Sequence, residues 1–323
     1  MPASPARPRY AYLGPAGTFT EAALRQVASP DEAEYVPQAD VVSAIEAVRT
    51  GVTEHAVVAI ESTVEGGVTA TLDALASGDP LVIEREVLVP VGFTLAAAPG
   101  VRLEDVRRIS AHPHAWVQCR RWLAATLPGV VHVPATSNTA PAALIATRIE
   151  EGRPAAGPDG LGFDAALVPP PAVEHYGLAV LADGVADNPS AVTRFVVVGH
   201  PGALPAPTGA DKTTLVVHLP SNNAGALLDM LEQFATRGVN LSRIESRPIG
   251  DELGRYSFSI DAEGHVAEAR VRDALMGLHR VCPLVRFLGS YPRADGVEPD
   301  VRTGTSDDDY VAARRWIDEV TSR

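Results

Sequence analysis

Thr193 and Arg194 stand side by side at the start of an apolar segment, residues 195–198, that has the composition of a buried strand. The ends of strands are where α/β proteins present polar groups to a ligand. The guanidinium of Arg194 is a fixed fork of donors that suits a carboxylate, and the hydroxyl of Thr193 can donate or accept. The pair is therefore consistent with a site for a small organic acid. By itself, however, a strand-favouring threonine beside a solvated arginine is the more common explanation.

A glycine-containing turn joins the first expected strand, residues 9–13, to the first expected helix, residues 19–27. Its sequence is Gly-Pro-Ala-Gly-Thr-Phe-Thr-Glu, in which Thr18 and Glu21 have the spacing of a capping box. The N–H groups and the dipole at a helix N-terminus favour an anion, and Gly17 lets the anion approach closely. The turn lacks the dinucleotide pattern G-x-G-x-x-G, and a tight, well-capped turn explains it equally well.

A second polar segment follows the apolar run of residues 55–60. Glu61, Ser62 and Thr63 place a carboxylate beside two hydroxyls, a combination that suits positioning or acid–base chemistry. The alternative is that Ser62 and Glu65 only cap the next helix, and for this segment alone the cap is the simpler explanation.

Three other patterns carry no expected chemistry. His112-Pro113-His114 has no third ligand at a suitable spacing, so we expect no metal site. Residues 209–214 look like the end of a phosphate-binding loop, but no glycine stands directly before Lys212 and a strand follows instead of a helix. No serine lies in a G-x-S-x-G elbow, which argues against a serine hydrolase.

Composition indicates a globular protein with room for two domains or three small α/β lobes: 323 residues, 46% hydrophobic and 21% charged. The formal net charge of −13 argues against nucleic acid or an anionic membrane as the main partner. No run of 18 apolar residues occurs, and the first residues lack an apolar secretory core. Cys119 and Cys282 are the only cysteines and form no CxxC pair, so we expect a cytoplasmic location.

Strand-like and helix-like segments alternate up to about residue 200, which predicts mostly parallel α/β layers. A Pro- and Gly-rich linker follows, and the pattern beyond it changes to the β-α-β-β-α-β order of a ferredoxin-like module. A polar tail ends in an amphipathic helix that Ser306 is expected to cap. Besides those given above, the expected helices are 41–49, 226–236 and 266–279, and the expected strands are 89–97, 108–111, 165–168, 194–198, 213–219, 240–249, 255–262 and 285–291.

Taken in order along the chain, these segments resemble bacterial prephenate dehydratases that carry a C-terminal amino-acid-binding (ACT) domain. The resemblance covers about residues 9–292, and several motifs in the right order are far more specific than any one of them. The matching segments are the opening motif at 14–20, the Glu-Asn-Ser segment at 59–66, the signature triplet Thr193-Arg194-Phe195, and the two regulatory motifs at 225–228 and 245–248.

The resemblance implies an α/β catalytic region with two lobes, like a periplasmic binding protein, at residues 1–200. Lobe 1 would comprise about 9–88 and 181–200, and lobe 2 about 89–180. A linker at 201–211, an α+β ferredoxin-like ACT domain at 212–292, and a polar tail with a short helix at 293–323 would complete the chain.

The resemblance also implies an activity. The enzyme would be a hydro-lyase that converts prephenate to phenylpyruvate, with loss of CO2 and water, in L-phenylalanine biosynthesis. It would need no cofactor and no metal. L-phenylalanine would bind the ACT domain as a feedback effector, and the chain would associate into a homodimer or homotetramer, without nucleic acid or membrane as partner.

The resemblance assigns the site residues individually. Thr193 would contact the leaving hydroxyl and Arg194 would pair with a substrate carboxylate, with Glu61 and Ser62 completing the catalytic set. The expected substrate-binding residues are Gly17, Thr18, Thr63, Ser137, Asn138 and Phe195. The expected effector-binding residues are Gly225, Ala226, Leu227, Glu245, Ser246, Arg247 and Pro248.

One departure from the family pattern falls in the expected site. Ser62 stands where the family has Asn, and Thr63 where it has Ser. The shorter hydroxyl loses one substrate hydrogen bond or bridges it through water. Three alternatives therefore stay open: an arogenate dehydratase, a non-aromatising prephenate decarboxylase, and a non-catalytic amino-acid sensor.

Overall fold

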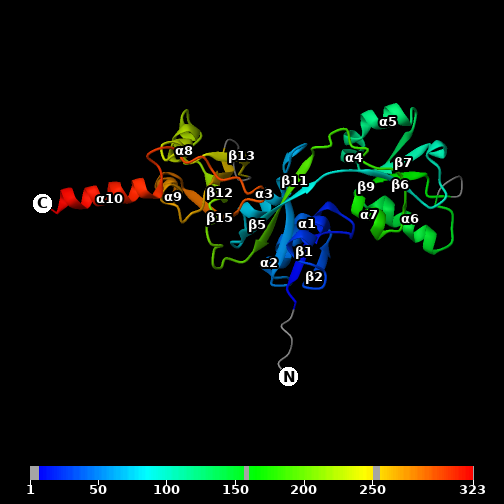
Figure 1. The fold of residues 1–323 in the computed structure, drawn as a ribbon, viewed down its shortest axis with the longest axis horizontal. Helices are drawn as coiled ribbons and strands as arrows, with labels where there is room; N and C mark the ends of the chain where they lie inside the picture. The colour runs from blue at the N-terminus through cyan, green and yellow to red at the C-terminus, as the bar shows by residue number, and fades with distance from the viewer. Residues whose placement is uncertain (1–6, 156–159, 250–254, 323) are drawn as a thin grey trace, which may run out of the picture. The chain divides into compact units, whose positions relative to one another are not determined.

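The computed structural model describes residues 7–155, 160–249 and 255–322. Helices and strands alternate along most of the chain, and the described residues form three sheets (Figure 1). Contacts divide the chain into two compact units, which are described separately below. The first unit is Met1–Val68 with Val87–Phe195, and the second is Thr69–Glu86 with Val196–Arg323.

The first sheet has the strand order β2-β1-β3-β11-β5, with β4 paired to β3. β1 runs parallel to β2 and β3, and β4 runs antiparallel to β3. Helices α1 (Phe19–Val27) and α2 (Val41–Arg49) have the predicted bounds and pack on β1 and β3. The strands are β1 (Arg9–Leu13), β2 (Glu34–Gln38), β3 (His55–Ser62), β4 (Gly66–Gly67), β5 (Val82–Pro90) and β11 (Val192–Gly199).

The second sheet lies wholly in the first unit and has the order β10-β6-β9-β7-β8. β7 is parallel to β8 and β9, whereas β6 is antiparallel to β9 and β10. The prediction of mostly parallel layers is therefore only partly right, because this sheet is mixed. The strands are β6 (Thr94–Ala97), β7 (Arg108–Ala111), β8 (Val131–Pro134), β9 (Ala165–Val168) and β10 (Ala179–Ala182).

One predicted strand is divided in two. Residues 89–97 read as a single strand, but β5 ends at Pro90 and β6 begins at Thr94. Between them the N–H of Val91 donates to the Ala191 carbonyl, and the chain passes from the first sheet to the second. Pro90 cannot donate to a ladder, and this loss favours the break.

Apolar side chains pack on both faces of the second sheet. Phe93, Ile109 and Leu167 belong to one buried cluster, and Ile145 and Phe163 to another. The sheet is therefore sandwiched, as in α/β layers. Its helices are α4 (Pro113–Gln118), α5 (Arg120–Thr126), α6 (Ala140–Glu150) and α7 (Pro170–His175), with a 3-10 turn, η1 (Leu103–Asp105).

The third sheet lies in the second unit, and its elements follow the predicted β-α-β-β-α-β order. Its strand order is β13-β14-β12-β15, and each pairing is antiparallel. Leu215, Phe234, Ile260 and Leu278 form the core between the sheet and its helices. The elements are β12 (Asp211–His218), α8 (Ala226–Ala235), β13 (Leu241–Pro248), β14 (Tyr256–Glu263), α9 (Ala269–Val281) and β15 (Leu284–Pro292).

The opposite face of the third sheet is polar and buried. Because side chains alternate along a strand, Thr214 and Asp261 point away from the core that holds Leu215 and Ile260. Asp261 accepts two hydrogen bonds of 2.9 Å from Arg243 and one of 2.8 Å from Thr214. Every one of these charges is paired, which is the condition under which burial is tolerated.

Residues 69–86 pack in the second unit although they precede it in the chain by more than 100 residues. They contain α3 (Thr69–Ala76) and the first part of β5. Glu86 accepts two hydrogen bonds of 3.1 Å from the ammonium of Lys212. A Cβ added at Gly289 would lie 2.3 Å from the Ile83 carbonyl oxygen, so the backbones approach too closely for any other residue at that position.

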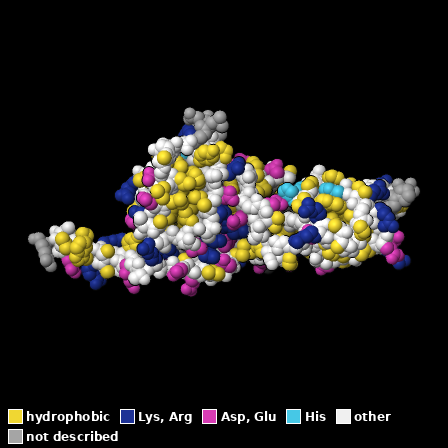
Figure 2. Space-filling view, turned by 90° about the horizontal axis from the view of Figure 1, so that it is seen from above, with side chains coloured by type: hydrophobic (Ala, Val, Ile, Leu, Met, Phe, Trp, Pro, Cys, Tyr) yellow, Lys and Arg dark blue, Asp and Glu magenta, His cyan; other side chains and the backbone are white. Residues whose placement is uncertain are grey.

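Helix α10 (Asp307–Thr321) follows in the second unit and begins with the predicted Ser306–Asp309 capping box. The N–H of Ala269 donates to Asp307 at 2.6 Å and ties the start of α10 to α9. Further along, apolar side chains of α10 lie on the surface (Figure 2). No helix within the described ranges is long and apolar enough to cross a membrane.

Two of the three boundaries between the units fall inside β5 and β11, and the third lies between Val68 and Thr69, where α3 begins. The assignment of residues 1–200, 201–211, 212–292 and 293–323 to separate domains stays a prediction.

Candidate active site

A cavity of about 400 Å³ lies in the first unit. It is formed where the ends of strands meet the first turns of the helices that follow them. Its volume is in the range of a small-molecule site, and its walls mix apolar surface with a few polar groups. It is lined by Leu13, Gly14, Thr18, Phe19, Thr20, Ala39, Ala59, Ser62, Glu65, Val68, Val91, Phe93, His112, His114, Gln118, Thr136, Ser137, Asn138, Pro169, Thr193 and Phe195.

The signature triplet divides between the two faces of β11. Thr193 and Phe195 line the cavity, whereas Arg194 between them does not, as the alternation of a strand requires. Arg194 is only 5% exposed, and its Nε donates to Glu61 at 3.2 Å. Glu61 does not line the cavity either. The structure therefore brings Thr193 and Phe195 into the cavity and places the Arg194–Glu61 pair behind it.

Ser62 and Thr63 sit beside the start of β11 and differ in role. Ser62 lines the cavity. Thr63 does not line it, but its N–H donates to the Val192 carbonyl at 2.9 Å and its hydroxyl accepts from the Val192 N–H at 3.0 Å. These two bonds hold the turn after β3 against the residue that precedes Thr193.

The turn before α1 contributes Thr18 to the cavity wall but not Gly17. The hydroxyl of Thr18 accepts the N–H of Glu21 at 3.2 Å, so Thr18 caps α1 as predicted. The N–H of Gly17 is already bonded to the buried carboxylate of Glu21 at 2.5 Å. Gly17 has φ +81°, and a Cβ there would lie 2.9 Å from the Ala172 Cα. Gly17 therefore shapes the turn.

Ser137 and Asn138 enter the cavity from the loop before α6. The hydroxyl of Ser137 accepts the N–H of Ala140 at 3.0 Å, which bonds a free donor of the first helical turn. The side-chain oxygen of Asn138 is buried and has no hydrogen-bond partner among the described residues. A buried acceptor of this kind is costly unless a ligand or water satisfies it.

Several polar residues outside the predicted site also line the cavity, among them His112, His114 and Gln118. The Nδ1 of His114 lies 2.8 Å from a carboxylate oxygen of Glu65. The spacing of the two histidines suggests only a metal pair, and no metal-binding group of three His, Cys, Asp or Glu occurs in the described residues. Their position directly after β7, at the same sheet edge as Pro169 after β9, is the signal that could have found them.

Burial, followed by the neighbouring His114 ring, lowers the pKa of His112, and the carboxylate of Glu65 opposes this shift. The two imidazole rings stand edge to face, with centroids 4.9 Å apart. The Nδ1 of His112 accepts the backbone N–H of His114 at 3.3 Å.

The predicted effector-binding residues belong to the second unit, and none of them lines this cavity. Gly225 has φ +95° at the start of α8, Ala226 is buried and Leu227 is exposed. Glu245, Ser246, Arg247 and Pro248 form the second half of β13, in which Ser246 and Pro248 are exposed. The guanidinium of Arg247 donates two hydrogen bonds of 3.0 Å to Asp73.

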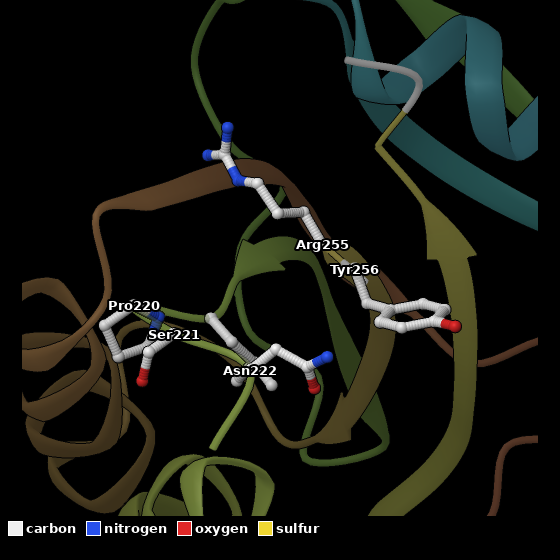
Figure 3. Close-up of a pocket in the computed structure, with 6 residues that line it drawn as sticks. Pro220, Ser221, Asn222, Arg255 and Tyr256 are labelled. Carbon is white, nitrogen blue, oxygen red and sulfur yellow. The ribbon is translucent and has the colours of Figure 1, made fainter. Parts of the chain in front are cut away.

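A smaller pocket of about 140 Å³ lies at one end of the third sheet (Figure 3). Ser221 and Asn222 come from the loop after β12, and Arg255 and Tyr256 from the start of β14. In Figure 3 the guanidinium of Arg255 points away from the loop, so this hollow offers hydroxyl and amide groups and no inward-facing cation from Arg255. None of the predicted effector residues lines it.

The geometry defines an α/β protein with a small-molecule cavity at strand ends and helix N-termini. The sequence profile described as prephenate dehydratase matches residues 10–203. A prephenate dehydratase of Amycolatopsis methanolica is 44% identical over 317 residues, which are 97% of each chain. The chain belongs to the prephenate dehydratase family.

Two solved structures share this fold but differ in the activity by which they are described. A prephenate dehydratase from Arthrobacter aurescens, in complex with L-Phe, is 52% identical with a TM-score of 0.88, covering 98% of this chain and 100% of that one. A protein described as a novel type of quorum quenching acylase is 29% identical with a TM-score of 0.73, covering 88% of this chain and 97% of that one. Proteins of similar fold are described with different activities, so the fold alone does not assign the reaction. The assignment depends on the residues that line the cavity.

Proposed function

We propose that this protein is a prephenate dehydratase, which converts prephenate to phenylpyruvate, CO2 and water. The observation that carries the proposal is the cavity that contains Thr193, Ser62, Thr18 and Asn138 in a chain of this family. Aromatisation drives the reaction, so the protein has only to orient the ring carboxylate for loss and to assist departure of the ring hydroxyl.

The proposed chemistry is a concerted fragmentation. As the bond to the ring carboxylate breaks, its electron pair moves through the ring and expels the hydroxyl, which takes a proton and leaves as water. The hydroxyl of Thr193 donates a hydrogen bond to the departing oxygen. Because a neutral hydroxyl is a very weak acid, the hydrogen bond stabilises developing charge while water supplies the proton. Phe195 provides apolar wall beside Thr193.

The other predicted site residues receive proposed roles that fit their surroundings. Ser62, Thr18, Ser137 and Asn138 contact the substrate with hydroxyl or amide groups. Gly17 and Thr63 act indirectly, by shaping the turns that carry Thr18 and Ser62.

Arg194 and Glu61 form a pair on the far side of β11 from Thr193. Arg194 would reach a substrate carboxylate only after its guanidinium left Glu61. We therefore propose that the pair holds β3 and β11 together and so positions Ser62 and Thr193.

The second unit is proposed as the regulatory part. Its β-α-β-β-α-β sheet supports an ACT domain, and the L-Phe complex of the Arthrobacter aurescens relative supports phenylalanine as effector. The predicted effector residues would bind it. A two-lobed catalytic region, a homodimer or homotetramer, and a cytoplasmic location with Cys119 and Cys282 as free thiols complete the proposal.

The test is a product assay with the purified protein on prephenate and arogenate side by side. We expect phenylpyruvate to form from prephenate at a rate far above the acid-catalysed background. A product that keeps the non-aromatic ring would indicate a decarboxylase, and phenylalanine from arogenate would indicate an arogenate dehydratase. If neither substrate were consumed, the chain would be a sensor and the proposal would be wrong.

A further inference from the structure

The cavity has to hold a doubly negative substrate without an obvious cation. Prephenate carries two carboxylates, and no Lys or Arg occurs among the described residues that line the cavity. The titratable side chains of that lining are Glu65, His112 and His114. Helix N-termini and neutral donors give partial compensation, but two carboxylates beside Glu65 leave an excess of negative charge. This argument rests on the proposed function.

His112 is placed to supply the missing charge. Its Nδ1 accepts the backbone N–H of His114, so the neutral ring carries its proton on Nε2 and presents a donor there. The residue is the N-cap of α4, and its backbone is fixed directly after β7. His114 is more exposed and already contacts Glu65 at 2.8 Å. His112 is less exposed, and no carboxylate of the described residues forms a direct ion pair with it, so it is the better candidate for the substrate.

We propose that His112 takes up a proton on Nδ1 when the substrate binds, which ends the hydrogen bond from the His114 N–H, and that Nε2 of the resulting imidazolium pairs with a substrate carboxylate. The Glu65–His114 pair orients the neighbouring ring. Before the substrate binds, burial and the His114 ring lower the pKa of His112 and favour its neutral form. A carboxylate placed against the ring favours the charged form. His112 is then a substrate-binding residue, and Glu65 and His114 are positioning residues.

The sign of the pH dependence follows. The imidazolium exists in the complex below the raised pKa and is lost as the pH rises through it, so the KM for prephenate should increase from about pH 6 to pH 8. The groups that face His112 are His114 on the same helix and Glu65 on the turn after β3. We therefore assign the slope of KM with pH to His112, and the His112→Asn variant tests this assignment.

The experiment measures kcat and KM for prephenate between pH 6 and 8 in the parent and in His112→Asn. Asparagine keeps a side-chain acceptor at the N-cap and removes the charge. We expect KM to rise about tenfold at pH 6, the value of one charge-assisted hydrogen bond, with a smaller change in kcat and a flat pH profile of KM. His112→Gln is the second variant if the first does not fold, and His175→Gln on the exposed end of α7 is the control with unchanged kinetics.

The outcomes separate this inference from the proposed function. An active parent together with a His112→Asn variant that keeps the parental KM and its slope with pH would overturn the histidine assignment alone. An equal loss of kcat at every pH with unchanged KM would also overturn it, because the residue would then act in the chemical step. A parent that does not convert prephenate would overturn the proposed function and this inference together.

Discussion

At the scale of single residues, the site depends on how β11 and the turn after β3 are aligned. Thr63 bonds both backbone groups of Val192, the residue before Thr193, while Ser62 reaches the cavity. The hydroxyls of Ser62 and Thr193 are thus carried on adjacent, hydrogen-bonded segments. Such a backbone-fixed arrangement is the kind of preorganisation that stabilises charge in a transition state.

Thr193→Val removes the hydroxyl with almost no change in shape. We expect kcat on prephenate to fall by roughly 10²- to 10³-fold, as for loss of one donor to a developing charge, while KM changes little. Thr193→Ser, which keeps the hydroxyl, is the matched control and should retain most of the activity. A valine variant with parental kcat in the steady-state assay would refute the role of Thr193.

At the scale of elements, a buried ion pair fastens residues 69–86 to the third sheet. The Glu86 side chain is 1% exposed and bonds Lys212 on β12, as well as the N–H of Ala294 at 2.8 Å. Removing one partner of such a pair leaves the other charge buried and unpaired. This lowers the free energy of unfolding more than the loss of an exposed pair does.

Lys212→Met should therefore destabilise the second unit by about 3–5 kcal/mol. Thermal unfolding followed by circular dichroism would show this as a lowered midpoint. Arg9→Met, which breaks the exposed Arg9–Glu54 pair, is the control and should change stability by less than about 1 kcal/mol. Equal midpoints for Lys212→Met and the control would show that the buried pair is not structurally important.

At the scale of the whole molecule, the strands that carry the site continue into the second unit. The chain runs from β3 and β4 directly into α3, and β11 continues from Phe195 into Val196. Asp73 of α3 also holds Arg247 of the predicted effector segment. A change at β13 thus has a physical connection to α3 and, through the chain, to the turn that carries Ser62.

If phenylalanine regulates the enzyme as proposed, Asp73→Asn should weaken its effect on activity several-fold while calorimetry still detects phenylalanine binding. The reason is that Asn cannot form the bidentate ion pair with Arg247. Asp31→Asn, at an exposed turn, is the control. Unchanged regulation in Asp73→Asn would exclude this ion pair as a route of communication.

Much of this architecture follows from local sequence signals. The bounds of α1 and α2 agree with those expected, and Thr18 caps α1 as predicted. The structure adds a cap at Asp40 for α2. Such interactions lie within a few residues of the chain. The element order of the third sheet and the family motifs are equally evident from the sequence.

Tertiary structure decided which of these residues share a cavity. The sequence motif predicts that Thr193 and Arg194 both contact the substrate. Strand alternation puts their side chains on opposite sides of β11, and the packed sheets place the cavity on the side of Thr193. Likewise, the sequence does not show that His112 lines the cavity, or that Glu65, from a distant segment, pairs with the neighbouring His114. Caps and periodicity act over a few residues, whereas a site depends on contacts between segments whose separation the sequence does not encode locally.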